Sequence, residues 1–261
     1  MPSVFPFSHR SIGMLVLGAT FAGIAACKQA NITPNDNTPG SSAQDNASAN
    51  DCSALPNSDQ LKHMLNAAPD SGDAGGMFHG RTEWGSVVNR SGRVCVIVAA
   101  TDSVGQRWPG SRNIARAKAF TANGFSTDTL PLSTARLYTL TQPGHSLWGV
   151  PQPVTFNPAC NSTTSDDAVC GGAIAFGGGV PLYKNGHIIG GLGVSGDTPC
   201  ADHEIAKRVR HIAGLDPAHG MLVDDIVYTK ADGPSVFAHP MCPNTWRNGQ
   251  KIGEEAPATG Y

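Results

Sequence analysis

The fold of this chain is decided by residues 176–206, which read FGGGVPLYKNGHIIGGLGVSGDTPCADHEIA. The apolar residues 180–183 predict one β-strand and residues 187–194 predict the return strand. The turn between them falls at Lys184-Asn185-Gly186, because Asn and Gly tolerate the positive φ that a tight hairpin requires. Thr198 can cap a following helix and Pro199 suits its first position. This stretch therefore predicts a hairpin followed by a helix.

The return strand is unusually rich in glycine, with Gly190, Gly191 and Gly193. Glycine weakens a strand and marks a bulge, or a place where another backbone or a ligand comes close. The unpaired amides and the positive dipole at the next helix start can hold an anion or a flat ligand. Two interpretations stay open: a ligand site, or tight strand packing without a ligand. In that helix Ile205, Ala206, Val209, Ile212 and Ala213 recur at helical spacing, with Lys207, Arg208 and Arg210 off the stripe and Gly214 as the expected stop.

A second helix is predicted upstream, from Ser111 as its N-cap to Phe125. Its apolar face carries Ile114, Ala115, Ala119, Ala122 and Phe125. Lys118 falls inside that face, with Thr121 alongside. A lysine on an apolar stripe must snorkel to water, pair with a carboxylate or meet a ligand anion. Two interpretations of Lys118 are kept, an internal salt bridge with Asp197 or Asp202, and contact with a bound anion.

The rest of the body reads as mixed α/β. The pattern predicts a short helix over 59–68, a hairpin with strands over 84–88 and 94–100, one further strand over 135–140 and a final strand over 222–228. Residues 158–172 are expected to form a surface excursion. The residues beyond 229 offer only Trp246 and Ile252 as apolar anchors.

Two sets of residues resemble the GlcG/HbpS haem-binding family, formerly DUF336. The first runs through Gly178-Gly179-Val180-Pro181, Asn185-Gly186, Gly190, Gly193-Val194-Ser195-Gly196, Asp202 and Glu204, and the second through Ser111, Ala115, Lys118-Ala119, Thr121-Ala122 and Phe125. The resemblance covers about residues 84–215. It implies an α/β (α+β) fold, an antiparallel sheet with covering helices, as a single domain over 52–261 with an insertion near 158–172 and a C-terminal extension over 229–261. It also implies a homo-oligomer.

The resemblance implies haem as the cofactor, bound by residues from both motifs: Lys118, Thr121, Gly193, Ser195 and Gly196. Lys118 and the amides near Ser195 and Gly196 would hold the propionates. Four histidines are candidates for an axial iron ligand: His79, His145, His187 and His203. The first functional hypothesis is therefore a membrane-anchored, extracytoplasmic haem-binding protein, and haem degradation is implied by the resemblance alone. Two alternatives are a structural or assembly lipoprotein without a ligand, and an enzyme acting on a small organic acid, since the family occurs beside glycolate metabolism.

The N-terminus has the features of a targeting segment. Arg10 precedes an apolar run over 12–22, and Ile24-Ala25-Ala26-Cys27 resembles a bacterial lipobox, which predicts a signal peptide over 1–26 and a lipid on Cys27. The alternative is ordinary cleavage near Ala26. Lys28 follows instead of Asp, so in a Gram-negative source we expect the outer membrane, facing the periplasm. Residues 27–51 nearly lack large apolar side chains and predict a disordered tether of about 25–30 Å.

Composition supports an exported protein that does not bind nucleic acid. The net charge is −2, so no basic surplus points to nucleic acid. Apart from Cys27 there are six cysteines, and an even number in an exported chain predicts disulfides. Cys160 and Cys170 bracket a polar loop and make the first candidate pair. Cys200 with Cys242 would pin the C-terminal residues, which leaves Cys52 with Cys95. Metal binding is the alternative, but the sequence has no CxxC pair.

Three segments begin like catalytic motifs but do not complete them. Gly144-His145-Ser146-Leu147 begins like a lipase nucleophile elbow, but Trp148 replaces the second glycine. His203-Glu204 begins like a zincin helix, but Lys207 replaces the second histidine. Gly193-Val194-Ser195-Gly196 runs into Asp197 and is no elbow either. The sequence thus contains no complete catalytic motif.

Overall fold

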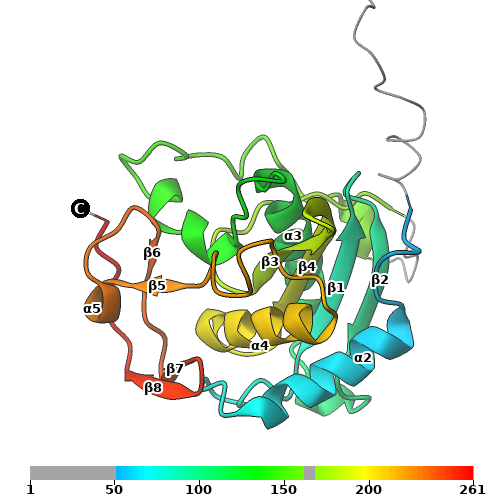
Figure 1. Cartoon of the computed structure of the whole chain (residues 1–261), viewed down its shortest axis with the longest axis horizontal. Coiled ribbons are helices and arrows are strands. Elements are labelled where there is room, and N and C mark those ends of the chain that lie inside the picture. The colour runs from blue at the N-terminus through cyan, green and yellow to red at the C-terminus, as the bar shows by residue number, and fades with distance from the viewer. Residues whose placement is uncertain (1–50, 162–167, 261) are drawn as a thin grey trace, which may run out of the picture. The chain divides into compact units, whose positions relative to one another are not determined.

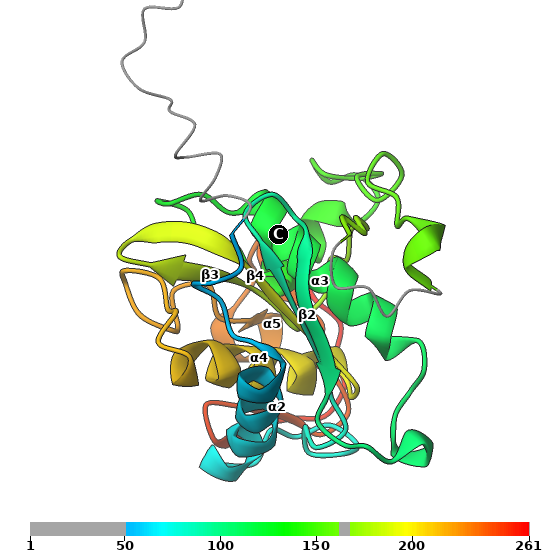
Figure 2. The ribbon, with the colours of Figure 1, turned by 90° about the vertical axis from the view of Figure 1, so that its right-hand side faces the viewer.

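The computed structural model of the chain describes residues 51–161 and 168–260. The predicted signal peptide, Cys27 and nearly all of the tether lie outside the described residues. At the centre is a four-stranded antiparallel sheet with the order β2-β1-β4-β3 (Figures 1 and 2). Its strands are β1 (Trp84–Asn89), β2 (Val94–Ala99), β3 (Gly179–Lys184) and β4 (His187–Ser195). The predicted mixed fold with an antiparallel sheet is confirmed.

Both predicted hairpins are present. Asn185, at φ 52°, and Gly186, at φ 83°, form the turn between β3 and β4. The glycines of β4 are explained by close packing: Gly190 lies against the Val88 carbonyl of β1, and α3 (Ser111–Phe125) lies directly against the rest of this strand. A Cβ at Gly193 would collide with the carbonyl oxygen of Ala115, and one at Gly191 with that of Ala119. Of the two interpretations of the glycines, the structure therefore shows tight packing against a helix backbone.

Helices cover both faces of the sheet. Figure 2 shows α3 on one face, with α2 (Ser58–Ala67) and α4 (Pro199–Ile212) on the other. The main hydrophobic core lies between the sheet, α2 and α4 and includes Leu61, Leu65, Val87, Leu192 and Ile205. The Thr198 hydroxyl caps α4 through the amide of Ala201, as predicted. Ser111 is not a cap: it is the first residue of α3, and Gly110 occupies the cap position.

Two strand predictions need correction. Residues 135–140, predicted as a strand, form the 3₁₀ helices η3 (Thr134–Leu137) and η4 (Thr139–Thr141). Hydrogen bonds from Ser133 Oγ to the Asp224 carbonyl and from Thr134 Oγ1 to the Phe176 carbonyl hold this segment across the fold instead of in the sheet. The strand predicted over 222–228 is short, because only Val227–Tyr228 (β5) is extended. Further short 3₁₀ helices are η1 (Ala68–Ser71), η2 (Val104–Gln106) and η5 (Pro158–Asn161).

The C-terminal residues are more ordered than their composition suggested. After β5 come α5 (Thr229–Asp232) and β6 (Ala238–His239), which pairs in parallel with β5. A hairpin of β7 (Thr245–Arg247) and β8 (Gln250–Gly253) then lies near α4 (Figure 1). Lys207 and Arg210 are almost completely buried, Lys207 against Asp225 and Asn248 and Arg210 against Asp224, and Arg208 is 7% exposed. The expectation that these three cations lie off the buried surface was therefore wrong.

Three disulfides lie within the described residues. They join Cys52 to Cys95, Cys160 to Cys170, and Cys200 to Cys242. The first ties the segment before α2 to β2, and the last ties the start of α4 to the C-terminal extension. Part of the predicted 158–172 excursion lies outside the described residues, but its two cysteines are buried. No helix of the described part is both long and apolar enough to cross a membrane.

Candidate functional site

Lys118 is an internal residue. Its side chain is 0% exposed, and Nζ lies 2.6 Å from Asp202 Oδ2 and 3.0 Å from the Val194 carbonyl oxygen, to which it donates. The Phe176 ring centroid is 5.0 Å from Nζ. Of the two interpretations of Lys118, the geometry is that of the internal salt bridge, with Asp202 as the partner. A propionate could reach this ammonium only if that pair were broken.

The amides that were expected to hold propionates are already bonded within the chain. Asp202 Oδ1 accepts hydrogen bonds from the amides of Gly196 and Asp197. Thr121 Oγ1 donates to the Ala117 carbonyl and accepts from the Ile174 amide. Gly193 and Ser195 are buried as well. All five residues predicted to contact haem are thus buried, and their side chains and amides build the interior of the fold.

The same interior holds an unusual carboxyl group. Glu83 is fully buried, and among the described residues neither of its carboxyl oxygens has a placed hydrogen-bond partner. Burial, with the charges of Asp202 and Asp197 nearby, raises the pKa of Glu83 well above its usual range. Burial also raises the pKa of Asp202, against the pull of Lys118. Because Asp202 has the ammonium and two amides as partners, we assign the proton to Glu83.

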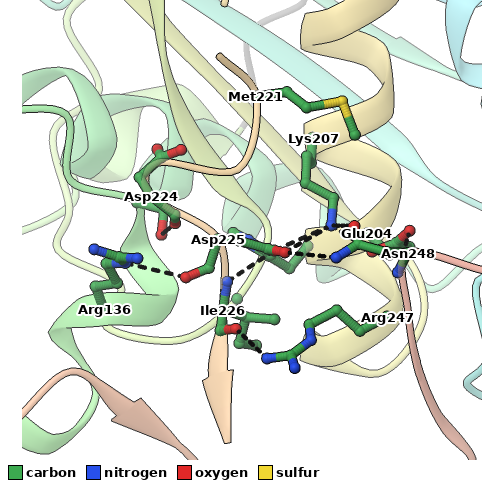
Figure 3. Close-up of polar contacts among 12 residues, drawn as sticks. Arg136, Glu204, Lys207, Met221, Asp224, Asp225, Ile226, Arg247 and Asn248 are labelled. Atoms are coloured by element: carbon green, nitrogen blue, oxygen red, sulfur yellow. Dashed lines mark hydrogen bonds and ion pairs between the residues drawn. The ribbon is translucent and has the colours of Figure 1, made fainter. Parts of the chain in front are cut away.

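A charged network on the outer side of α4 is also structural. Figure 3 shows Lys207 between Glu204 and Asp225, with Asn248 from the C-terminal hairpin. Lys207 Nζ lies 2.8 Å from Glu204 Oε2, 3.0 Å from Asp225 Oδ1 and 2.6 Å from Asn248 Oδ1. In the zincin-like segment at His203-Glu204, Glu204 and Lys207 therefore belong to an internal ion-pair network.

The four candidate axial histidines lie in different surroundings. His203 is buried on α4, with Nε2 3.4 Å from Asp225 Oδ1. His145 is half-buried in the irregular segment after η4. His79 and His187 are exposed, and each places Nδ1 2.8 Å from an aspartate, Asp73 and Asp128 respectively. Only these last two both border a surface cleft and present an accessible ring.

The cleft beside His187 combines charge and apolar surface. Its volume is about 830 Å³, and it lies between the β3–β4 turn, the loop after α3 and the segment before α2. Its lining comprises Ala54, Arg90, Thr127, Asp128, Thr129, Lys184, Asn185, His187, Ile188 and Ile189. The cleft beside His79 is smaller, about 460 Å³, and its cation Arg81 is 3.1 Å from Asp70. The His187 cleft is thus the better candidate for a large anionic ligand.

The loop after α3 is fixed against the hairpin by Asp128 and Tyr183. Asp128 Oδ1 accepts from the Ile188 amide at 2.8 Å, and Oδ2 is 2.8 Å from His187 Nδ1. These two hydrogen bonds lower the pKa of Asp128. The Tyr183 hydroxyl donates to the Thr127 carbonyl at 2.7 Å. With Nδ1 bonded to a carboxylate, the His187 ring is oriented so that Nε2 is the nitrogen that can bind a metal.

Arg90 brings a fixed positive charge to this cleft. Its Nη1 donates to the side-chain oxygen of Asn123 at 3.0 Å and to that residue's carbonyl, and its Nη2 donates to the Ser126 carbonyl at 3.2 Å. All three acceptors are formally uncharged, so the guanidinium charge is not neutralised by them. Lys184 adds a second, exposed cation on the turn. The cleft can therefore hold carboxylates beside a potential metal ligand.

The comparisons with known proteins fit this architecture. Residues 84–210 match the family described as "Haem degrading protein HbpS-like". This segment is similar to the HbpS-like family, and the match covers just under half of the chain. Among curated proteins, 111 residues are 32% identical to the corrinoid adenosyltransferase PduO of Salmonella typhimurium, over 41% of this chain and 27% of that enzyme. The chain thus spans about a quarter of the length of that relative.

Solved structures give weaker likenesses to this chain. Klebsiella pneumoniae protein ORFY is 24% identical with a TM-score of 0.43, over 59% of this chain and 88% of the other. A structure described as a PduOC:Heme complex gives the same values. A double mutant of HbpS from Streptomyces reticuli is 21% identical with a TM-score of 0.37, over 61% and 91% of the two chains.

Sequence reasoning named His187 but missed its partners. Asp128, Arg90 and Lys184 come from three separate loops, and only the fold brings them together. One signal was available: a histidine and a lysine flank the predicted Asn-Gly turn, so their side chains had to lie near one hairpin end. Nothing in the pattern placed residue 128 beside that hairpin.

Proposed function

We propose that this protein binds haem in the cleft beside His187. The observation that carries the proposal is the exposed imidazole, 75% accessible, whose Nδ1 is held by Asp128 on a cleft with two cations. A carboxylate on the second ring nitrogen fixes the ring and raises the basicity of a histidine ligand. The similarity to the HbpS-like family, which is described by haem degradation, supports haem as the ligand.

The residues of the cleft suit the parts of a haem molecule. His187 would bind the iron, Arg90 and Lys184 would hold the propionates, and Ile188 and Ile189 offer apolar surface to the macrocycle. Bound haem would supply the redox and ligand-binding chemistry of its iron. The chain's own part is to orient the imidazole through Asp128 and to neutralise the propionate charge. Only the family description suggests haem degradation, so we propose that the protein binds haem and propose no reaction.

Addition of hemin to the purified protein tests the proposal. We expect a shifted Soret band that saturates at one hemin per chain, and His187→Ala should weaken binding at least about tenfold, because an iron ligand is lost. His211→Ala is the matched control. His211 is also exposed and also pairs through Nδ1 with an aspartate, Asp216, but it does not line the cleft. No Soret shift in the wild type would favour a structural lipoprotein, and equal loss in both variants would refute this cleft.

We further propose that the protein is exported, anchored by a lipid on Cys27 and assembled as a homo-oligomer. Three disulfides in the described residues support an oxidising compartment, since such bonds persist mainly outside the cytosol. The lipobox resemblance supports the anchor and the family resemblance supports the oligomer. Replacement of Cys27 by Ser should leave unprocessed precursor and abolish labelling with a fatty-acid probe. Normal maturation of Cys27→Ser to a soluble protein would refute the anchor, and a monomer by light scattering would refute the oligomer.

A further inference from the structure

Two short segments with the same ligand spacing meet at the start of α4. Cys200 and His203 are three residues apart on α4, and His239 and Cys242 are three residues apart in the C-terminal extension. Residues at that spacing in a helix lie on one face. All four side chains are buried. Two cysteines and two histidines are a ligand set of structural zinc sites.

Three of the four ligand atoms are already close together. One atom each of Cys200, His239 and Cys242 lies within 4.8 Å of the other two. Cys200 and Cys242 form a disulfide, and the amide of Cys200 donates to Cys242 Sγ at 3.2 Å. That amide at the helix start would stabilise a thiolate on Cys242 if the disulfide were reduced. The Cys200 amide can therefore stabilise the Cys242 sulfur in the reduced state as well as in the disulfide.

Two hydrogen bonds fix the ring of His239 within the described residues. Its Nε2 accepts from the Gly177 amide at 3.1 Å, and its Nδ1 donates to the Pro240 carbonyl at 2.6 Å. A metal at either nitrogen would replace one of these two hydrogen bonds. The other would then fix the ring, as outer partners of metal-bound histidines do.

His203 supplies the independent observation that points to a ligand. It is 1% exposed, its Nε2 lies 3.4 Å from Asp225 Oδ1, and within the described residues neither ring nitrogen makes a hydrogen bond of good geometry. It lies beside the same backbone as His239, since a Cβ at Gly177 would be 3.0 Å from the His203 Cβ. The Tyr228 hydroxyl, in the hydrophobic cluster that includes Cys200 and Cys242, is also buried without a partner. Buried unsatisfied groups of this kind are explained by a bound water or ion.

We propose that reduction of the Cys200–Cys242 disulfide creates a site for a soft divalent metal such as Zn²⁺. A dithiol donor gives two electrons and two protons to the disulfide and becomes a disulfide itself. The metal then binds as both thiols release their protons, with His239 as third ligand and His203 as fourth. The C-terminal extension would thus stay tied to α4 in both states, by a covalent bond when oxidised and by the metal when reduced.

The first test uses Co²⁺ as a spectroscopic probe on the full mature chain. After reduction with a non-chelating phosphine, we expect one Co²⁺ per chain, with the intense visible bands of a tetrahedral ion and a near-ultraviolet thiolate charge-transfer band. Zn²⁺ should bleach both, and the oxidised protein should show neither. His203→Ala should weaken Co²⁺ binding at least about tenfold if it is a ligand. Octahedral Co²⁺ only, or no binding to the reduced protein, would overturn the proposal.

The second test needs no variant, so it does not depend on the folding of one. Reduced protein is alkylated with and without Zn²⁺, and the modified cysteines are identified by mass spectrometry. Zn²⁺ should protect Cys200 and Cys242 and leave the four other cysteines of the described disulfides reactive. The matched control replaces Cys160 and Cys170 by Ser, which should leave the Co²⁺ spectrum unchanged. Protection of Cys160 and Cys170 instead, or a spectrum lost in that control, would refute the assignment.

Discussion

The two ends of β4 differ in what their side chains do. At the end near Ser195, Lys118, Asp202, Glu83 and the strand amides form a closed interior in which the ammonium already has its carboxylate. At the end near His187, that histidine and the cations Arg90 and Lys184 line an open cleft. The residues that resemble a ligand site in sequence are at the closed end. The comparison teaches that a motif of buried glycines and charges can specify packing, while the groups that we propose to bind haem lie at the strand's other end.

We expect the largest change in stability when the buried ammonium of Lys118 is removed. Lys118→Met keeps most of the side-chain volume but leaves Asp202 buried without its cation, so we expect the free energy of unfolding to fall by about 3–5 kcal/mol. Urea unfolding followed by circular dichroism measures this change. An unfolding free energy within about 1 kcal/mol of the wild type would show that the interior does not depend on this pair.

Lys62→Met is the matched control for that variant. Lys62 also pairs with an aspartate, with Nζ 2.8 Å from Asp102 Oδ1, but this aspartate is 89% exposed. Exposed pairs of this kind contribute about 0–1 kcal/mol. The two lysines therefore make the same contact in opposite surroundings. Equal losses of stability in Lys62→Met and Lys118→Met would contradict the role given to burial.

The buried carboxyl group gives a smaller effect that depends on pH. The pKa of Glu83 is raised in the folded state, so the folded protein holds a proton that the unfolded chain releases above its ordinary value of 4.5. The stabilisation is complete below that value and is lost as the pH rises through the raised pKa. The slope for one proton is about 1.4 kcal/mol per pH unit. Glu83→Gln should remove this slope, and urea titrations at several pH values would show it; an unchanged slope would contradict protonation of Glu83.

We expect the smallest effect at the open end of β4, on hemin affinity. Lys184→Met removes an exposed charge from the β3–β4 turn, so the free energy of hemin binding should weaken by only about 0.2–1 kcal/mol, and less at high salt. Protein stability should be unaffected. Hemin titrations at low and high ionic strength would measure the difference. A loss that does not depend on salt would mean that Lys184 contributes through packing and not through charge.

Much of the fold could be predicted from local patterns. The hairpin turn at Asn185-Gly186, the cap at Thr198 and the helix over 111–125 follow from residue types whose conformational preferences act locally. Long-range outcomes could not be predicted in this way. The choice between Asp197 and Asp202 as the partner of Lys118 depends on how α3 crosses the sheet. The burial of Lys207 and Arg210 depends on Asp224, Asp225 and Asn248, which come later in the chain and outside the helix.

The central claim is that the closed end of β4 builds the fold while the open end binds the ligand. It is tested most directly by measuring the hemin dissociation constants of Lys118→Met and His187→Ala side by side, at a temperature where both are folded. The account predicts that Lys118→Met melts earlier but binds hemin as the wild type does. It predicts that His187→Ala melts as the wild type does but binds at least about tenfold more weakly. Weak binding by folded Lys118→Met together with normal binding by His187→Ala would contradict it.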